Sequence, residues 1–203
     1  MWNKRYAVDQ FVYGTEPNQF FKETLDRLEI TGKMLFPAEG EGRNAVYAAK
    51  NRADVYAYDI SSEAKRKALT FAEKENVRID YQVGDIEELN YADNTFDAAV
   101  LVFAHFPPNI RTAIHKKVGK LIKPGGIIIL EGFSVGNLIH RKNNPSIGGP
   151  DKAPMLFTNE IIKQDFKNFD PMLIETVEVE LNEGSLHKGK GEVVRFIGRK
   201  IEQ

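Results

Sequence analysis

The sequence predicts an α/β fold, a doubly wound and mostly parallel sheet of seven strands that ends in an antiparallel hairpin. Two observations support this prediction. Up to residue 130, short apolar runs typical of buried strands alternate with segments of helical periodicity. After residue 157, a helical segment precedes two strand-like runs joined by a glycine-rich turn, which is typical of a hairpin. The length of 203 residues favours a single domain over residues 1–203.

The chain begins with an aromatic-rich segment, residues 1–30, that ends in a helix for which Asn18 is the predicted N-cap. Residues 34–49 then contain a strand, a tight glycine turn and an alanine-rich helix without a gap. The remaining strands are predicted at 53–60, 79–83, 96–103, 127–130, 177–181 and 193–198, and further helices at about 61–72, 107–122 and 159–169.

Two segments fall outside this alternation. Residues 134–157 are long, polar and rich in glycine, proline and basic side chains, so we predict a lid loop there. The aromatic residues of the first 13 positions, among them Tyr6 and Tyr13, have two readings. They cover apolar surface, or they form a flap over a ligand pocket.

Composition excludes several classes of function. The formal net charge of -1 provides no overall field to attract nucleic acid or an anionic membrane. Without cysteine there is no disulfide or thiolate chemistry, and four scattered histidines predict no metal site. The amino end has no apolar signal core and no run is long enough to span a bilayer. We therefore expect a cytoplasmic protein, either a monomer or a homodimer.

The glycine turn matches two ligand classes. Residues 40–45 satisfy the G-x-G-x-x-G/A pattern of dinucleotide-binding folds, and Asp59 lies about 20 residues on, as expected of a ribose-binding acid. However, Glu39 and Glu41 flank the glycines, and a carboxylate near a pyrophosphate costs about 1–4 kcal/mol. An acidic turn favours a cationic nucleoside without phosphate, namely S-adenosyl-L-methionine. The candidate cofactor-binding residues of the turn are Glu39, Gly40, Glu41, Gly42 and Asn44.

Acidic residues also end the next two predicted strands. Asp59 is placed to accept bonds from ribose hydroxyls, or alternatively to cap the helix that begins near residue 61. Asp85 follows the third strand, within reach of an adenine amino group, and Ile86 can lie against the ring. Ile60 and Phe103, at the ends of the second and fourth strands, complete the candidate cofactor-binding residues.

At this point the chain resembles the class I S-adenosylmethionine-dependent methyltransferases over nearly its whole length. The resemblance depends on the glycine turn, Asp59, Gly84-Asp85, residues 121–126 and the terminal hairpin, all in the family's order. It implies a Rossmann-like methyltransferase fold with S-adenosyl-L-methionine as cofactor. The family's acid in the first strand is absent, because Phe36 stands there, and Glu39 is expected to supply the charge.

Within that class the chain looks like the small bacterial tellurite-resistance and thiopurine-type methyltransferases. The likeness is carried by residues 2–6, 13–18 and 38–44 and by Gly148-Gly149-Pro150. It implies a small-molecule acceptor, with soft chalcogens and other toxic anions as candidates. We expect no nucleic-acid partner, because the chain has neither an excess of basic charge nor an added recognition domain.

Methyl transfer needs alignment of the acceptor more than it needs a base, because the sulfonium is already activated. If a base is used, His105 is placed for it, although it equally fits a helix-entry residue bonded to backbone. His187, Lys188 and Arg195 of the hairpin, with Arg141 of the lid loop, are expected to form a basic rim for an anionic acceptor, or to be solvated charges. The candidate substrate residues are Tyr6, Tyr13, Phe106, Arg141, His187 and Arg195.

Two other functions remain open at this stage. An NAD(P)-linked oxidoreductase would use the same glycine pattern. A non-catalytic domain that binds S-adenosylmethionine for regulation would use the same nucleoside site without transferring a methyl group.

Overall fold

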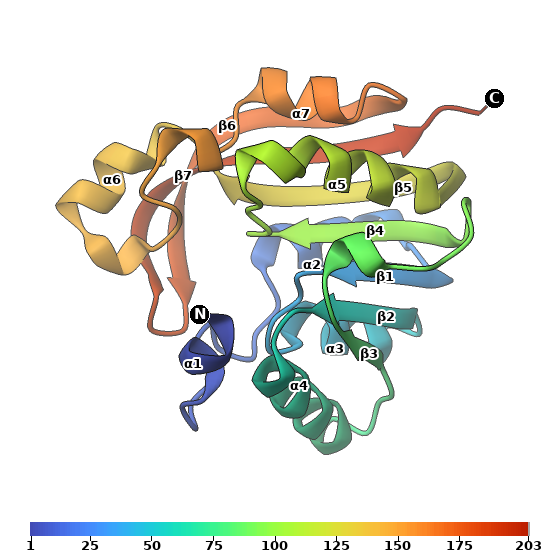
Figure 1. Ribbon diagram of the computed structural model, residues 1–203, viewed down its shortest axis with the longest axis horizontal. Coiled ribbons are helices and arrows are strands. Elements are labelled where there is room, and N and C mark those ends of the chain that lie inside the picture. Colours follow the sequence, from blue (N-terminus) through green and yellow to red (C-terminus); the bar gives the residue numbers. More distant parts are fainter. Residues whose placement is uncertain (203) are drawn as a thin grey trace.

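A computed structural model describes residues 1–202, apart from the side chain of Glu87. Within these residues, seven strands form one sheet in the order β3-β2-β1-β4-β5-β7-β6. All neighbouring pairs from β3 to β5 are parallel, whereas β7 runs antiparallel to both β5 and β6 (Figure 1). The predicted fold class is therefore confirmed. The strands are β1 (Lys33–Pro37), β2 (Asp54–Asp59), β3 (Asp80–Val83), β4 (Phe96–Val102), β5 (Ile122–Phe133), β6 (Phe169–Glu183) and β7 (His187–Lys200).

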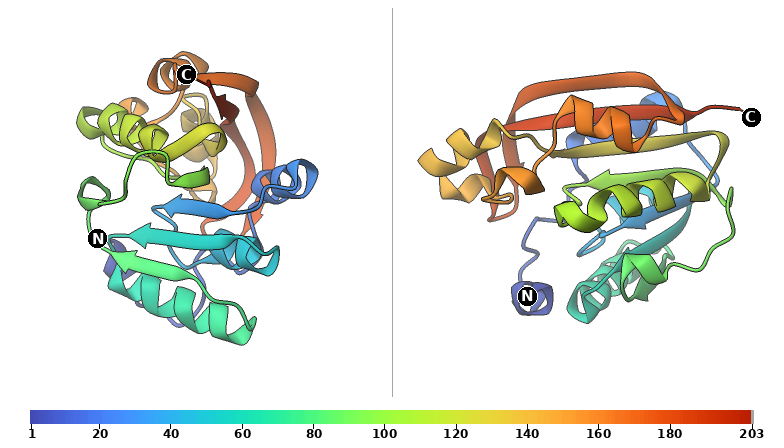
Figure 2. Two further views of the ribbon diagram at one scale, coloured as in Figure 1. Left: turned by 90° about the vertical axis from the view of Figure 1, so that its right-hand side faces the viewer. Right: turned by 45° about the horizontal axis from the view of Figure 1, so that its top comes forward.

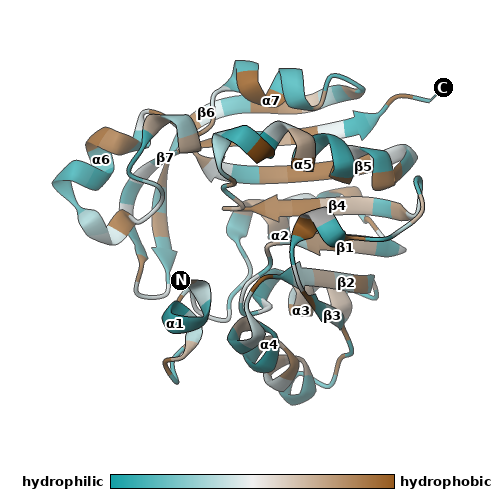
Figure 3. Ribbon diagram, viewed as in Figure 1, coloured by the Kyte–Doolittle hydropathy of each residue, from teal (hydrophilic) through white to brown (hydrophobic). Residues whose placement is uncertain are grey.

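Helices cover both faces of the sheet, as a mostly parallel sheet requires. Helices α2, α3 and α4 pack with the strands in one apolar cluster, and α5 and α7 pack in another on the opposite face. Figure 2 shows α2 and α5 on opposite sides of the sheet, and Figure 3 shows that its central strands are the most apolar part. The helices are α1 (Trp2–Tyr6), α2 (Gln19–Leu28), α3 (Arg43–Lys50), α4 (Ser62–Lys74), α5 (Pro108–Leu121), α6 (Asn137–Asn143) and α7 (Asn159–Asp165).

Local capping explains where two of these helices begin. The side chain of Asn18 accepts a hydrogen bond from the backbone N–H of Phe21, so the predicted cap of α2 is confirmed. In the same way, the hydroxyl of Ser61 accepts from the N–H of Ala64 at the start of α4. Ser61, and not Asp59, therefore caps that helix, which leaves Asp59 for another role.

Three segments differ from the prediction. The first residues form a short helix, α1, in the part of the aromatic-rich segment before Asn18, where no helix was predicted. Residues 134–157 contain α6 and two 3₁₀ turns, η2 (Pro145–Ile147) and η3 (Ala153–Met155). The strands of the hairpin extend well beyond the two apolar runs that predicted them. Only the part of each strand that packs on the core alternates in polarity, so the remaining part gave no strand signal. No helix among the described residues is long and apolar enough to cross a bilayer.

Candidate functional site

The carboxyl ends of β1 and β4 lie side by side, at the point where the strand order reverses. Ligands of open α/β sheets bind at this position. The residues that follow the two strands, Ala38 and Phe103, both have left-handed backbone, with φ of 54° and 51°. Non-glycine residues rarely adopt this conformation, and it concentrates at ligand sites. The backbone therefore marks this edge of the sheet as the candidate site.

The glycine turn, residues 38–42, is tied to the ends of β2 and β3. The N–H of Gly40 donates to Asp59 Oδ2 at 3.0 Å, and the N–H of Ser61 donates to Asp59 Oδ1 at 2.9 Å. The hydroxyl of Tyr81 donates to the carbonyl of Gly40 at 2.6 Å. Each Asp59 oxygen has a second lone pair, so the carboxylate can still accept from a ribose. Burial raises the pKa of Asp59.

Gly42 enables the close passage of the turn over α4. Its φ is 90°, and a Cβ there would lie 2.7 Å from the Cβ of Ala68. The turn then leads into the amino end of α3, where Glu39 Oε1 accepts from the N–H groups of Asn44 and Ala45 at 3.0 and 2.8 Å. Burial raises the pKa of Glu39 to about 7. Within the described residues, no hydrogen bond engages its second oxygen, which is available to a ligand cation.

Glu41 points away from the turn's inner edge. Its carboxylate forms an ion pair with Lys67 of α4, and both side chains are almost fully buried. It also accepts from the N–H of Val12 at 2.8 Å. The charge predicted for Glu41 is thus neutralised, and Glu39 and Asp59 are the two acids of the turn without a cationic partner among the described side chains. The argument against a pyrophosphate therefore rests on Glu39 and Asp59.

The aromatic residues near the amino end cover the turn. The hydroxyl of Tyr6 would lie 2.8 Å from a Cβ at Gly40, so the ring lies directly against this glycine. Tyr6 stacks on Trp2, and its edge meets Tyr13 at 6.4 Å between ring centres. Both readings of this segment therefore apply, because Tyr6 is a buried residue and also covers the candidate site.

The predicted adenine side of the site is apolar and open. Ile60 is 56% exposed at the end of β2, and Val83 is 43% exposed at the end of β3 beside it. Ile86 is buried under α5, whereas the backbone carbonyl of Asp85 accepts from the hydroxyl of Tyr58 at 2.8 Å. An exposed apolar pair next to Asp59 fits the face of a nucleobase.

His105 is bonded to backbone at both ring nitrogens. Its Nδ1 lies 2.9 Å from the carbonyl of Met155, and its Nε2 accepts from the N–H of Phe133 at 3.0 Å. Burial lowers the pKa of His105 to about 4. This geometry matches the structural alternative for His105, because its one basic lone pair is already occupied.

The basic residues predicted as a rim each have a different environment. Arg195 Nε donates to Glu131 Oε2 at 2.7 Å, and His187 is buried against Glu183. Arg141 lies on α6 and has neither ion pair nor hydrogen bond within the described residues. The remaining substrate candidate, Phe106, packs beside His115 under α5.

Sequence reasoning missed the carboxylates that bind these cations. Glu183 accepts from Arg43 at 2.9 Å and from Asn18 at 3.0 Å, and Asn18 also donates to Glu131 at 2.7 Å. A signal was present for Glu183, because a period of two places it on the same face of β6 as Val179 and Leu181. A carboxylate on the apolar face of a strand requires a partner.

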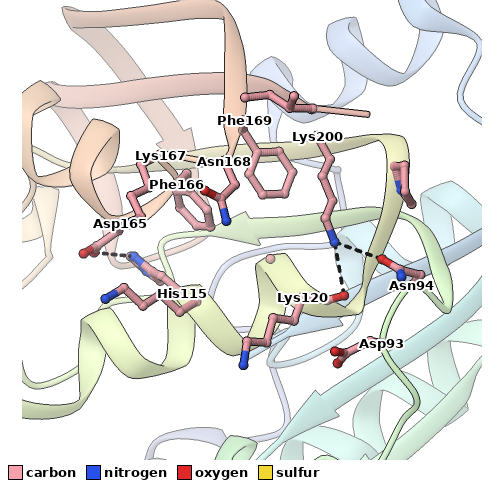
Figure 4. A pocket seen from close by; sticks show the side chains of 14 residues that line it. Asp93, Asn94, His115, Lys120, Asp165, Phe166, Lys167, Asn168, Phe169 and Lys200 are labelled. Carbon is pink, nitrogen blue, oxygen red and sulfur yellow. Dashed lines mark hydrogen bonds and ion pairs between the residues drawn. The ribbon is translucent and has the colours of Figure 1, made fainter. Parts of the chain in front are cut away.

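A cavity of about 470 Å³ lies at the opposite edge of the sheet, between the carboxyl end of α5 and the end of β7 (Figure 4). There Lys200 donates to the carbonyl of Lys120 at 3.3 Å and to Asn94 at 3.0 Å, and His115 pairs with Asp165 at 2.8 Å. These contacts stabilise the end of α5 and its packing on α7. They lie apart from the glycine turn.

Part of the chain is similar to a known protein family. Residues 37–126 match the model of a family described as a methyltransferase domain. This domain contains the glycine turn, Asp59 and the end of β4. The match to a methyltransferase domain agrees with S-adenosyl-L-methionine as the predicted cofactor. A structure from Methanosarcina mazei, described as one of the SAM-dependent methyltransferases, shares the fold. Its identity is 20%, its TM-score is 0.65, and the alignment covers 84% of this chain and 93% of that one.

Curated relatives of the methyltransferase domain match about half of the chain. The uncharacterized protein YafE of Escherichia coli is 32% identical over 100 residues, which cover 48% of each protein. A sterol 24-C-methyltransferase of Clavispora lusitaniae is 24% identical over 97 residues, 45% of this chain and 26% of that protein. The chain thus spans a quarter to a half of the length of these relatives.

Two further structures share the fold of the methyltransferase domain. One comes from work on the conversion of a disulfide bond into a thioacetal group during echinomycin biosynthesis, with a TM-score of 0.78, 15% identity and coverage of 98% and 91% of the two chains. TehB from Haemophilus influenzae has a TM-score of 0.71 and 18% identity, and covers 98% of this chain and 65% of its own. Identities this low show the fold alone, so the tellurite-resistance subtype stays a prediction.

Proposed function

We propose that this protein transfers the methyl group of S-adenosyl-L-methionine to a small-molecule acceptor bound over the end of β4. The observation that carries the proposal is the pair of acids at the glycine turn. Glu39 and Asp59 have no cationic partner there, and Glu39 has a free oxygen on the ligand side. Such a site favours an ammonium and a sulfonium and disfavours phosphate.

The same acids argue against the NAD(P)-linked alternative. A direct comparison is a thermal-shift assay with S-adenosylhomocysteine and NADH at equal concentration. We expect stabilisation by S-adenosylhomocysteine alone, because a ligand that binds the native state raises its unfolding temperature. Stabilisation by NADH alone would contradict the proposal.

Transfer itself is tested with a donor that carries a labelled methyl group. The purified protein is incubated with this donor and the low-molecular-weight fraction of a cell extract, and label is expected in a product other than the donor. The Asp59→Ala variant is the negative control, because it is expected to bind the donor less tightly and so to transfer less label. If the protein binds donor but transfers no label, the regulatory-domain alternative stands.

Paired cations bear on the class of acceptor. Arg195 and His187 of the predicted basic rim are each bonded to a carboxylate, which leaves Arg141 and Lys188 as the rim cations without an ion pair among the described residues. An acceptor that is uncharged as it binds fits this surface better than a soft chalcogen anion. Selenite and tellurite belong in the labelled-donor assay as the test of that second candidate.

A further inference from the structure

His187 and Glu183 face each other across the turn of the β6–β7 hairpin. They are paired in register, and His187 Nδ1 lies 3.1 Å from Glu183 Oε2. An ionised carboxylate only accepts hydrogen bonds, so Nδ1 carries the proton and the basic lone pair is on Nε2. The orientation of the imidazole is therefore fixed by its carboxylate.

Other residues fix the carboxylate in turn. Glu183 accepts from Arg43 Nη2 at 2.9 Å and from Asn18 Nδ2 at 3.0 Å. Burial alone would raise the pKa of Glu183, but the charge of Arg43 and the hydrogen bonds outweigh burial and lower this pKa to about 2. Burial lowers the pKa of His187, and the bond to Glu183 opposes this effect. At neutral pH the pair is a carboxylate and a neutral imidazole.

The ring of His187 lies in an aromatic box formed with Tyr13, Phe103 and Phe133. The centres of these rings are 4.6, 4.5 and 5.3 Å from that of the imidazole. Within residues 1–202, Nε2 has no hydrogen-bond partner. The fully buried side-chain atoms that lack a partner do not include this nitrogen. The basic lone pair of this buried side chain is therefore unoccupied by the described residues.

The aromatic box adjoins the donor site on two sides. Phe103 directly follows β4 at the switch point and has left-handed backbone. Tyr13 contacts Tyr6, which lies on Gly40. Arg43, the first residue of α3 after the glycine turn, is bonded to the carboxylate of Glu183. The imidazole thus lies between the cover of the turn and the exit of β4, with its Nε2 edge beside Gly148, where a Cβ would lie 3.4 Å from Nε2.

We propose that His187, oriented by Glu183, is the general base that takes the proton of an acceptor with an O–H or N–H group. This inference rests on the proposed methyl transfer. The acceptor oxygen or nitrogen bonds to the methyl carbon while the carbon–sulfur bond breaks, and the sulfur keeps the electron pair as S-adenosylhomocysteine. The proton passes from the acceptor to Nε2 and later to water. Such proton transfer contributes about 10²–10⁴-fold to a rate.

The acceptor class follows from the same box. A flat, small molecule that is neutral as it binds and donates a hydrogen bond fits three aromatic rings and one imidazole lone pair. Phenol is the simplest probe with these properties. Anisole has the same shape but no O–H, so it is the matched control.

The test is ¹⁵N NMR of the full chain labelled at histidine, with S-adenosylhomocysteine bound and at pH 7.5. We expect His187 to be neutral with its proton on Nδ1, and we expect phenol at millimolar concentration to shift Nε2 while anisole does not. Glu183→Gln should change the tautomer of His187. His140→Gln, a change at a partly exposed residue of α6, should leave every one of these signals unchanged.

A protonated imidazole at pH 7.5, a proton on Nε2, or no response of Nε2 to phenol would each overturn the base assignment. Calorimetric measurement of S-adenosylhomocysteine binding to the same sample tells failure of the base assignment apart from failure of the proposed function. Absence of S-adenosylhomocysteine binding would overturn the donor site itself, whereas binding together with one of those signals overturns the base alone.

Kinetics test the role once the labelled-donor assay has produced an acceptor. His187→Gln should lower kcat about 100-fold or more with little change in the KM of the donor, and should remove the acid limb of the pH–rate profile at saturating donor. The charges of Arg43 and Arg5 and the side chains of Glu183 and Tyr13 act on the imidazole. The pKa of Glu183 is lowered to about 2 by Arg43 and its hydrogen bonds, and burial raises the pKa of Tyr13, so neither of these two groups titrates between pH 5 and 8. A His187→Gln variant with the wild-type rate would contradict the assignment.

Discussion

Glu41 and Lys67 form a buried ion pair that fastens the amino-terminal segment to the glycine turn. The Lys67 ammonium also donates to the backbone carbonyls of Val8 and Gln10, at 2.8 and 2.6 Å, and Glu41 accepts from the N–H of Val12. One acid and one base thus fix the segment that carries Tyr6 and Tyr13 over the site. The cover of the donor site depends on this pair.

We predict that Glu41→Gln loosens this segment, because it leaves the Lys67 charge buried without a partner. Removing one member of a buried pair costs about 3–5 kcal/mol. Faster hydrogen exchange at residues 8–14 and a lower unfolding temperature are the expected results. Glu63→Gln breaks an exposed pair with Arg66 and serves as control, with an effect below about 1 kcal/mol. Equal effects of the two variants would show that the buried pair does not fasten the segment.

Asp59 is expected to contribute to donor binding as well as to the shape of the turn. Asp59→Ala removes an acceptor for ribose hydroxyls and should weaken binding of S-adenosylhomocysteine by about 1–3 kcal/mol, measured by calorimetry. The control is Asp170→Asn, at an exposed position of β6. Unchanged affinity in a folded Asp59→Ala protein would rule out the ribose contact.

Donor binding should strengthen as pH rises through about 7. Glu39 has a folded-state pKa of about 7, so it is largely neutral at pH 6 and ionised at pH 8. Only the ionised form attracts an ammonium, and we expect the Kd of S-adenosyl-L-methionine to fall about tenfold over this interval. Glu39→Gln should give a Kd with little pH dependence. A wild-type Kd that is constant from pH 6 to 8 would contradict the role of Glu39.

Acid should destabilise the fold between about pH 6.5 and 4 in part through His105. The unfolded histidine binds a proton near pH 6.5, whereas the folded residue does so only near pH 4, because burial lowers its pKa. The free energy of unfolding contributed by this difference is complete above pH 6.5 and is lost as pH falls through that window. Urea titrations of wild type and His105→Asn should show a shallower slope in the variant, by about 1–3 kcal/mol across the window. Identical slopes would exclude His105 as a source.

The fold was predictable because buried parallel strands and their helices give the strongest periodic signals. Asp59 and Gly40 could be placed together because Asp59 ends β2 and Gly40 lies in the turn that follows β1, its neighbour in the sheet. The direction of Glu41 could not, since the residue is in a turn and its partner Lys67 lies a helix away. The proposed role of His187 as a base could not be predicted either, because its partner Glu183 and its aromatic neighbours come from separate segments.

Arg43 and Glu183 are 140 positions apart, yet their contact joins the first helix after the glycine turn to the tip of the last hairpin. During synthesis, the segment that carries the glycine turn leaves the ribosome well before β6 and β7, which lie beside it in the folded protein. The emerging chain must therefore carry an unpaired Arg43 and an uncovered apolar edge for many seconds of synthesis.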